Sequence, residues 1–190
     1  MSREVHVRFR ESLGVKFPRA TRLVILCRSR DDAERALSVV QQWTAEAGLT
    51  LHPEKTHVAH SVTDGFEFPG YHFQRGERFP RAKSLKKLKS TIREKTRRKQ
   101  RHGIECTIQD VNTTLAGWFE YFQHVTKRYV FEDLDRFVRQ RLRAILKKQS
   151  KQPGIPRGRD FQRWPNAFFG ERKLFSLKAA HVSACQSSAR

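Results

Sequence analysis

The chain has 190 residues, which is enough for one domain or two small ones with a buried core. Its 39 Lys and Arg against 19 Asp and Glu give a formal net charge of +20 and a pI near 10.8. This excess of positive charge indicates a polyanionic partner, which could be RNA, DNA or an acidic membrane surface. The 14 Phe and 3 Trp exclude a disordered basic tail and predict a folded protein.

The segment up to about residue 78 has the pattern of a mixed α and β unit. Residues 23–27 form an apolar run rich in β-branched side chains, which predicts a buried strand. A helix is expected after the polar turn at 28–32, where Asp31 and Asp32 are interpreted as capping residues. Its apolar positions are Ala33, Leu37, Val40, Trp43 and Ala47, and Gly48 stands where a C-cap is favoured. The turn at 63–65 and the aromatic stretches after it predict hairpins.

From about residue 80 the composition becomes basic and helical. Between Arg81 and Arg101 there are 11 Lys and Arg and one acid, Glu94. Ser84 is expected to cap this basic helix, whose narrow apolar stripe consists of Leu85, Leu88 and Ile92. A solvated helix normally alternates Lys with Glu, so the charge pattern favours phosphate contacts over a merely solvated surface.

Two further helices are predicted downstream. The first begins at Thr107, where Thr107 and Asp110 resemble a capping box, and its apolar positions are Ile108, Val111, Leu115, Trp118, Phe119 and Phe122. The second runs from about Phe131 to Lys148, with Phe131, Leu134, Val138, Leu142 and Ile145 inward. Arg136, Arg139, Arg143 and Lys147 are expected to lie largely outward. A Pro- and Gly-rich stretch at 152–158 ends this unit, and aromatic segments follow at 164–169 and 174–177.

The candidate RNA contacts come from these basic helices. The expected phosphate ligands on the first are Lys86, Lys87, Arg93, Arg97, Arg98 and Arg101. Arg136, Arg139 and Arg143 are expected to form a second wall of the same groove, and Lys55 is a further candidate. Trp118, Phe119 and Phe122 could stack on bases, but their helical period favours a core role.

Several other classes of site or location are disfavoured. Cys27, Cys106 and Cys185 are far apart, which predicts free thiols rather than a disulfide or zinc site. The 8 His residues show no ligand spacing, so no metal site is expected. The sequence has no apolar run of membrane-spanning length and no signal-peptide core, which predicts a cytoplasmic protein without a membrane partner.

Three groups of residues resemble a known family. Residues 24–29 (Val-Ile-Leu-Cys-Arg-Ser), 48–56 and 65–73 resemble the end of the palm of bacterial group II intron reverse transcriptases. Residues 112–146, with Gly-Trp-Phe-Glu-Tyr-Phe at 117–122, resemble the maturase-specific thumb of those proteins, as do 164–169 and 174–181. The resemblance implies an α+β fold with a small, mainly antiparallel sheet. Its expected parts are a truncated palm at 1–78, a helical maturase-specific domain at 79–181 and a disordered tail at 182–190.

The chain departs from that family at the catalytic motif. The polymerases carry Tyr-Ala-Asp-Asp before the strand, and its aspartates hold two Mg²⁺ ions. Here the segment at 17–23 reads Phe-Pro-Arg-Ala-Thr-Arg-Leu, so both aspartates are missing and Arg22 stands near their place. We therefore expect no catalytic residues, no metal or other cofactor, and no polymerase activity by the chain alone.

The function expected from the residues and the resemblance is RNA binding. The chain would be a maturase-like fragment that assists the folding and splicing of a group II intron RNA. One alternative is a subunit of a split reverse transcriptase, completed by a separate palm-and-fingers chain. The other is a non-functional remnant of a mobile element with generic nucleic-acid affinity, which the abrupt start of the sequence favours. A truncated palm should expose an edge strand and an apolar face, so a homodimer or a partner chain is also expected.

Overall fold

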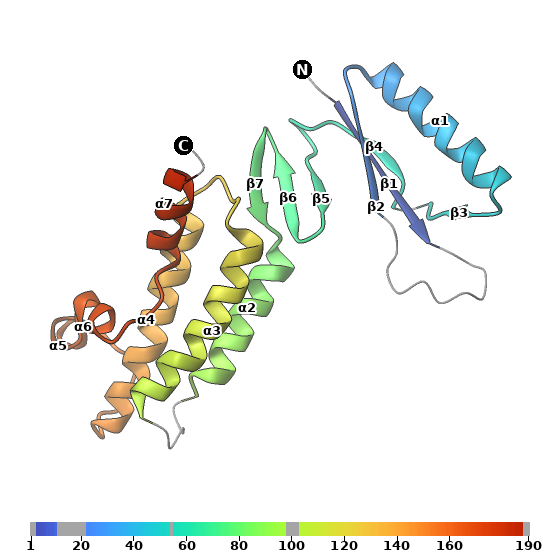
Figure 1. Ribbon diagram of the computed structural model, residues 1–190. Coiled ribbons are helices and arrows are strands. Elements are labelled where there is room, and N and C mark those ends of the chain that lie inside the picture. The colour runs from blue at the N-terminus through green and yellow to red at the C-terminus, as the bar shows by residue number, and fades with distance from the viewer. Residues whose placement is uncertain (1–2, 11–21, 54, 98–102, 188–190) are drawn as a thin grey trace. The chain divides into compact units, whose positions relative to one another are not determined.

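The protein is organised as two compact units, residues Met1–Arg81 and Ala82–Arg190, which are coloured blue to green and green to red in Figure 1. The computed structural model describes residues 3–10, 22–53, 55–97 and 103–187. Antiparallel strands and helices make the fold α+β, as the sequence predicts. Most of the segment at 17–23, where the resemblance predicts the position of the catalytic motif, lies outside the described residues.

The first unit is built on a small antiparallel sheet whose central strand is β1, Arg3–Arg10. β2 (Arg22–Cys27) pairs along one side of β1, which confirms the strand predicted at 23–27. Two short strands, β3 (Thr50–Leu51) and β4 (His57–Ala59), also pair antiparallel with β1. β1 was not predicted, although Val5, Val7 and Phe9 alternate with polar residues in the sequence, a pattern that predicts a strand.

Helix α1, Arg30–Glu46, packs on this sheet. Its start follows from local chemistry, because the Ser29 hydroxyl accepts the Asp32 backbone N–H at 3.1 Å and donates to the Asp32 carboxylate at 2.7 Å. The N-cap is therefore Ser29, and of the two aspartates interpreted as capping residues Asp32 takes part through these hydrogen bonds with Ser29. The helix ends before Gly48, whose φ of 67° is the left-handed conformation of a C-cap glycine.

The core of this unit lies between α1 and the sheet. It centres on the fully buried Ala33, against which Ile25, Cys27, Leu37, Val40, Leu51 and Val58 pack. Trp43 does not join them and is exposed on α1, although its spacing had suggested the same face.

A second antiparallel sheet follows in the chain: β5 (Phe66–Phe68), β6 (Tyr71–Gln74) and β7 (Glu77–Pro80). The hairpins predicted from the aromatic stretches are confirmed by this pairing. The rings of Phe66 and Phe73, which are register partners, stack at 4.9 Å. Gly65 before β5 has φ 63°, and a Cβ there would lie 2.7 Å from the Phe73 carbonyl oxygen, so only glycine fits the turn.

The second unit is helical. Its long helices are α2 (Ala82–Lys95), α3 (Ile104–Phe122) and α4 (Tyr129–Gln149), followed by α5 (Arg159–Arg163), α6 (Asn166–Glu171) and α7 (Leu177–Ser187). The periodicity of the sequence is confirmed, because Ile108, Val111, Leu115, Phe131, Val138, Leu142 and Ile145 are each at most 1% exposed. The tail expected to be disordered from residue 182 is helical as far as Ser187. None of the described helices is long and apolar enough to cross a membrane.

Two predicted helix starts are wrong by three residues. α2 begins at Ala82, so Ser84 lies inside the helix instead of capping it. α3 begins at Ile104, and the Thr107 hydroxyl donates back to the Gly103 carbonyl at 3.3 Å. A threonine hydroxyl makes this bond within the first turn of a helix as readily as it caps one, which explains the error.

Two polar side chains, Asn112 and Asp135, hold the C-terminal segment on the long helices. Asn112 of α3 clamps the chain on both sides of Leu174: its amide donates to the Lys173 carbonyl and its oxygen accepts from the Phe175 N–H, both at 2.8 Å. Asp135 of α4, 5% exposed, accepts from the Ser176 hydroxyl at 2.7 Å and from the backbone N–H groups of Leu177 and Lys178 at 3.0 and 3.3 Å. A carboxylate from another helix therefore caps the N-terminus of α7.

Candidate nucleic-acid interface

The positive charge of the protein is concentrated in the helical unit. Residues 82–190 contain 26 of the 39 Lys and Arg but 9 of the 19 Asp and Glu, which amounts to +17 of the total charge of +20. The first unit is close to balance. Any surface that attracts a polyanion by charge is therefore expected on α2, α4 or the segments after them.

Helix α2 separates its apolar and basic residues. Leu88 and Ile92 are buried, 4% and 1% exposed, and fix the inward face. Lys83, Lys86, Lys87 and Arg93 are exposed on the remaining surface, and Arg97 is exposed just beyond the helix. With Glu94 the only acid of this helix, its surface is a strongly cationic one. Arg98 and Arg101, which the sequence added to this set, lie outside the described residues.

The C-terminal half of α2 is attached to α4 by aromatic and guanidinium contacts. The Arg93 guanidinium lies over the Phe137 ring, 5.3 Å from its centroid, and the Lys89 ammonium lies over the same ring at 5.8 Å. These contacts orient the stems of both cations.

Arg141, one turn after Phe137, caps the end of α2. Its guanidinium donates to the Thr96 hydroxyl at 3.0 Å, to the Thr96 carbonyl at 2.8 Å and to the Arg93 carbonyl at 3.4 Å. A cation at this place also meets the negative end of the helix dipole. Sequence reasoning did not identify Arg141 as important, and no local signal could have done so, because its partners lie 45 and 48 positions earlier.

The expectation that Arg143 faces outward is wrong. The side chain is 4% exposed, its Nε donates to the Trp164 carbonyl at 2.8 Å, and its Nη2 donates to the Asn166 side-chain oxygen at 2.9 Å. The rings of Phe161 and Phe169 lie 4.8 and 5.1 Å from the guanidinium carbon. Burial lowers the pKa of the Arg143 guanidinium, and the nearby charge of Arg139 lowers it further. Arg143 is therefore a structural residue and is removed from the candidate interface.

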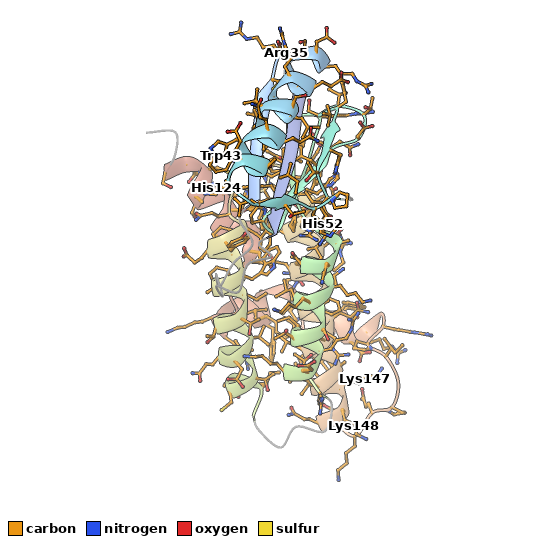
Figure 2. The ribbon with its side chains drawn as sticks, turned by 90° about the vertical axis from the view of Figure 1, so that its right-hand side faces the viewer. Arg35, Trp43, His52, His124, Lys147 and Lys148 are labelled. Carbon is orange, nitrogen blue, oxygen red and sulfur yellow. The ribbon has the colours of Figure 1, made fainter. Side chains whose placement is uncertain are left out.

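Lys147 is likewise not a surface cation. Its ammonium contacts the Asp160 carboxylate at 2.8 Å and the Ile155 carbonyl at 3.3 Å, so it fastens the loop after α4 to the helix end. Hydrogen bonds from Lys147 and from the Arg157 backbone N–H hold the pKa of Asp160 below its ordinary value. The neighbouring Lys148 extends into solvent at the end of α4 (Figure 2).

Other candidates keep their places on the surface. Arg136 is exposed and pairs with Asp133 on the same helix at 3.1 Å, a bond that a phosphate could replace. Arg139 is half-buried on α4. Lys55 is exposed and belongs to the first unit, so it is not grouped with the cations of α2.

Trp118 is half-buried within an aromatic group. Its ring stacks on Phe122 at 4.5 Å and meets the edge of Phe131 at 6.3 Å. Phe119 and Phe122 are 8% and 5% exposed. The core role that the helical period favours for Phe119 and Phe122 is confirmed by these values, and Trp118 forms the rim of the same cluster.

The described residues offer no site for a metal ion. Among them, no group of three or more His, Cys, Asp or Glu side chains is placed so that it could hold one. Cys27, Cys106 and Cys185 are free thiols.

These features define a class: a compact, strongly basic helical unit in which α2 carries more exposed cations than any other described helix. Residues 85–164, from α2 to the end of α5, match the family model of the group II intron, maturase-specific domain. The chain therefore carries a maturase-specific domain at 85–164. No curated protein matches the chain with statistical significance.

Proposed function

We propose that this protein binds RNA through the exposed cations of α2, as a maturase-like fragment that assists the folding and splicing of a group II intron. The match of residues 85–164 to the maturase-specific domain supports a role related to that intron. It does not by itself identify the surface that contacts RNA. The surface is inferred from how the cations of the domain are used.

The observation that carries the proposal is that some basic side chains of this unit are bonded to other protein groups, whereas others are exposed and unpaired. Arg141, Arg143 and Lys147 direct their donors to backbone carbonyls and to Asn166 or Asp160. In contrast, Lys86, Lys87 and Arg97 are exposed and make no ion pair with any other residue that the structure describes. Unpaired surface cations on α2 and just beyond its end are a source of phosphate contacts that requires no rearrangement of the protein.

The proposed mechanism is electrostatic. Cations that neutralise RNA phosphates allow two RNA helices to approach each other, and the folded RNA then carries out its own chemistry. The protein supplies binding and positioning only. This proposal needs no metal ion and no catalytic side chain from the described residues.

The test is binding of the full chain to a group II intron RNA, titrated with salt beside an unrelated RNA of equal length and a duplex DNA. Reversing Lys86, Lys87 and Arg97 to Glu should weaken intron binding at least about tenfold at roughly 150 mM salt. It should also make the decrease of the logarithm of the binding constant with the logarithm of the salt concentration less steep by about 3, roughly one for each lost phosphate contact. The matched control reverses Lys151, Arg157 and Arg159, which are also exposed and change the net charge equally.

The control separates location from total charge. If both triple variants lose the same affinity, the protein responds only to net charge and α2 is not the interface. If the wild-type chain binds all three nucleic acids equally, the intron role is refuted and the chain is a basic remnant with generic polyanion affinity. A preference for the intron RNA that α2 reversal removes, while the control retains it, supports the proposal.

A further inference from the structure

Helix α1 has a second apolar face, on a different side from the one that packs on the sheet. One side of the helix holds the buried Ala33 and packs on the sheet. On another side, Ala36 is half-buried, Val39 is 66% exposed and Trp43 is 58% exposed. We define these three residues as the outer stripe of α1. Single exposed apolar residues are ordinary, but these follow each other at i, i+3 and i+7, the spacing of a helix–helix seam.

The charge of α1 argues against nucleic acid as the occupant of the outer stripe. The helix carries four acids and two bases, which are Asp31, Asp32, Glu34, Glu46, Arg30 and Arg35. In a chain of net charge +20 this is a locally acidic helix. A polyanion would be repelled here, whereas a protein surface that offers apolar residues and both signs of charge would fit.

We propose that the outer stripe of α1 binds the same helix of a second copy of this chain, in antiparallel orientation. The charges at the two ends of the stripe select this arrangement. Arg35 lies at one end and Glu46 at the other, 11 positions or about 16 Å apart along the helix axis. In an antiparallel pair the two ends exchange places, so each Arg35 meets the Glu46 of the second copy; a parallel pair would put like charges together.

The register of such a pair is fixed by the same residues. A two-fold axis beside Gln41 places Val39 of one copy opposite Trp43 of the other, and symmetry repeats the contact. Arg35 then lies within about 1.5 Å of the axial level of the second copy's Glu46, the rise of one residue. Both side chains are available for this: Arg35 is 76% exposed in its pair with Asp32, and Glu46 accepts only the amide of Gln42, at 3.0 Å, among described residues.

The size of the contact predicts a weak dimer. About three helical turns per copy, with Val39 and Trp43 as the only large side chains of the stripe, cover well under the roughly 800 Å² per partner of a standard stable interface. The dissociation constant of the dimer should therefore be about 10–100 μM. Figure 2 labels Arg35 and Trp43, which both lie on α1. The inference does not depend on the proposed RNA function, because it concerns the other unit of the chain.

The test is sedimentation equilibrium of the RNA-free full chain from about 2 to about 200 μM at roughly 150 mM salt. The wild type should show a monomer–dimer equilibrium, and Val39→Glu should raise its dissociation constant at least about tenfold. Ala45→Glu is the matched control, because Ala45 is exposed on the same helix but away from the outer stripe. It adds the same side chain and should leave the equilibrium unchanged. Circular dichroism checks that both variants stay folded.

A charge exchange tests the orientation. Arg35→Glu alone should weaken the dimer, because it places two acids together in each contact. Adding Glu46→Arg should restore it, since each contact again joins opposite charges. A chain that remains monomeric at about 200 μM, or a dimer that Val39→Glu leaves intact, overturns the proposal. So does a Val39→Glu variant that loses RNA affinity while the wild type shows no dimer, because RNA would then be the occupant.

Discussion

Replacing Asp135 by Ala tests whether one buried carboxylate holds the C-terminal helix in place. Asp135 is 5% exposed and accepts three hydrogen bonds from the start of α7. Its removal leaves the N–H of the fully buried Leu177 without an acceptor, which costs about 1–3 kcal/mol. Loss of the cap and of its charge at the helix dipole adds roughly 1–2 kcal/mol. Relief of the buried charge offsets part of this, and we expect a net loss of about 3 kcal/mol.

The assay is thermal and urea unfolding followed by far-ultraviolet circular dichroism. If the helical unit unfolds cooperatively, a loss of that size lowers its Tm by roughly 10–20 °C. Asp133→Ala is the matched control: Asp133 lies two positions earlier on the same helix, 56% exposed, and pairs only with Arg136 among described residues. Its replacement should cost less than about 0.5 kcal/mol. If the two variants differ by less than about 1 kcal/mol, Asp135 does not hold α7.

Hydrogen exchange distinguishes local from global loss. If α7 alone detaches in Asp135→Ala, the amides of Leu177 and Lys178 should exchange far faster while those of α3 and α4 stay protected. If all amides of the helical unit lose protection together, the carboxylate stabilises the unit as a whole. Unchanged protection at Leu177 would refute the reasoning, since that amide donates to Asp135 directly at 3.0 Å.

Three further changes have defined outcomes. Arg141→Ala should cost about 2 kcal/mol in urea unfolding, because the Thr96 carbonyl loses its donor, and a loss below about 0.5 kcal/mol would mean that water replaces the guanidinium. The pKa of Asp160 is lowered mainly by its hydrogen bond with Lys147. The ionised Asp160 carboxylate therefore stabilises the fold fully above the ordinary carboxyl pKa of about 4, and this stabilisation is lost as the pH falls through the lower folded-state pKa. Between about pH 6 and about pH 2, the free energy of unfolding should therefore change less with pH in Asp160→Asn than in the wild type. An equal dependence of the free energy of unfolding on pH in the two proteins would contradict this. Trp118→Ala should cost roughly 2–4 kcal/mol, and if stability holds while RNA binding falls, the ring is a contact residue instead.

Local patterns in the sequence predicted the elements well where short-range chemistry decides them. The strand at 23–27, the helix start beside Asp32 and the left-handed Gly48 each depend on neighbouring residues, and each is confirmed. The apolar period of α3 and α4 likewise predicts which residues are buried. Apolar and polar residues alternate in the sequence of β1, so this strand could have been predicted.

Predicting the use of individual cations was harder, because it depends on contacts far along the chain. Arg143 follows Arg136 and Arg139 at helical spacing, so an outward position was the natural interpretation. The segment that buries it arrives 21 to 23 positions later, and folds over that side of α4. Nothing within α4 distinguishes an arginine that meets solvent from one that a later loop covers. The palm assignment of residues 1–78 stays a prediction from resemblance.

The way Arg143 is held has a consequence for which replacements the protein tolerates. A planar guanidinium reaches two acceptors at once while its faces lie against Phe161 and Phe169, and a lysine ammonium offers neither the fork nor the flat faces. On the surface of α2 the requirement is only for positive charge, so Lys and Arg should exchange there with little effect. Sequence drift in this domain should therefore be uneven among its basic residues: free interchange at Lys86 and Lys87, and strict retention of arginine at position 143.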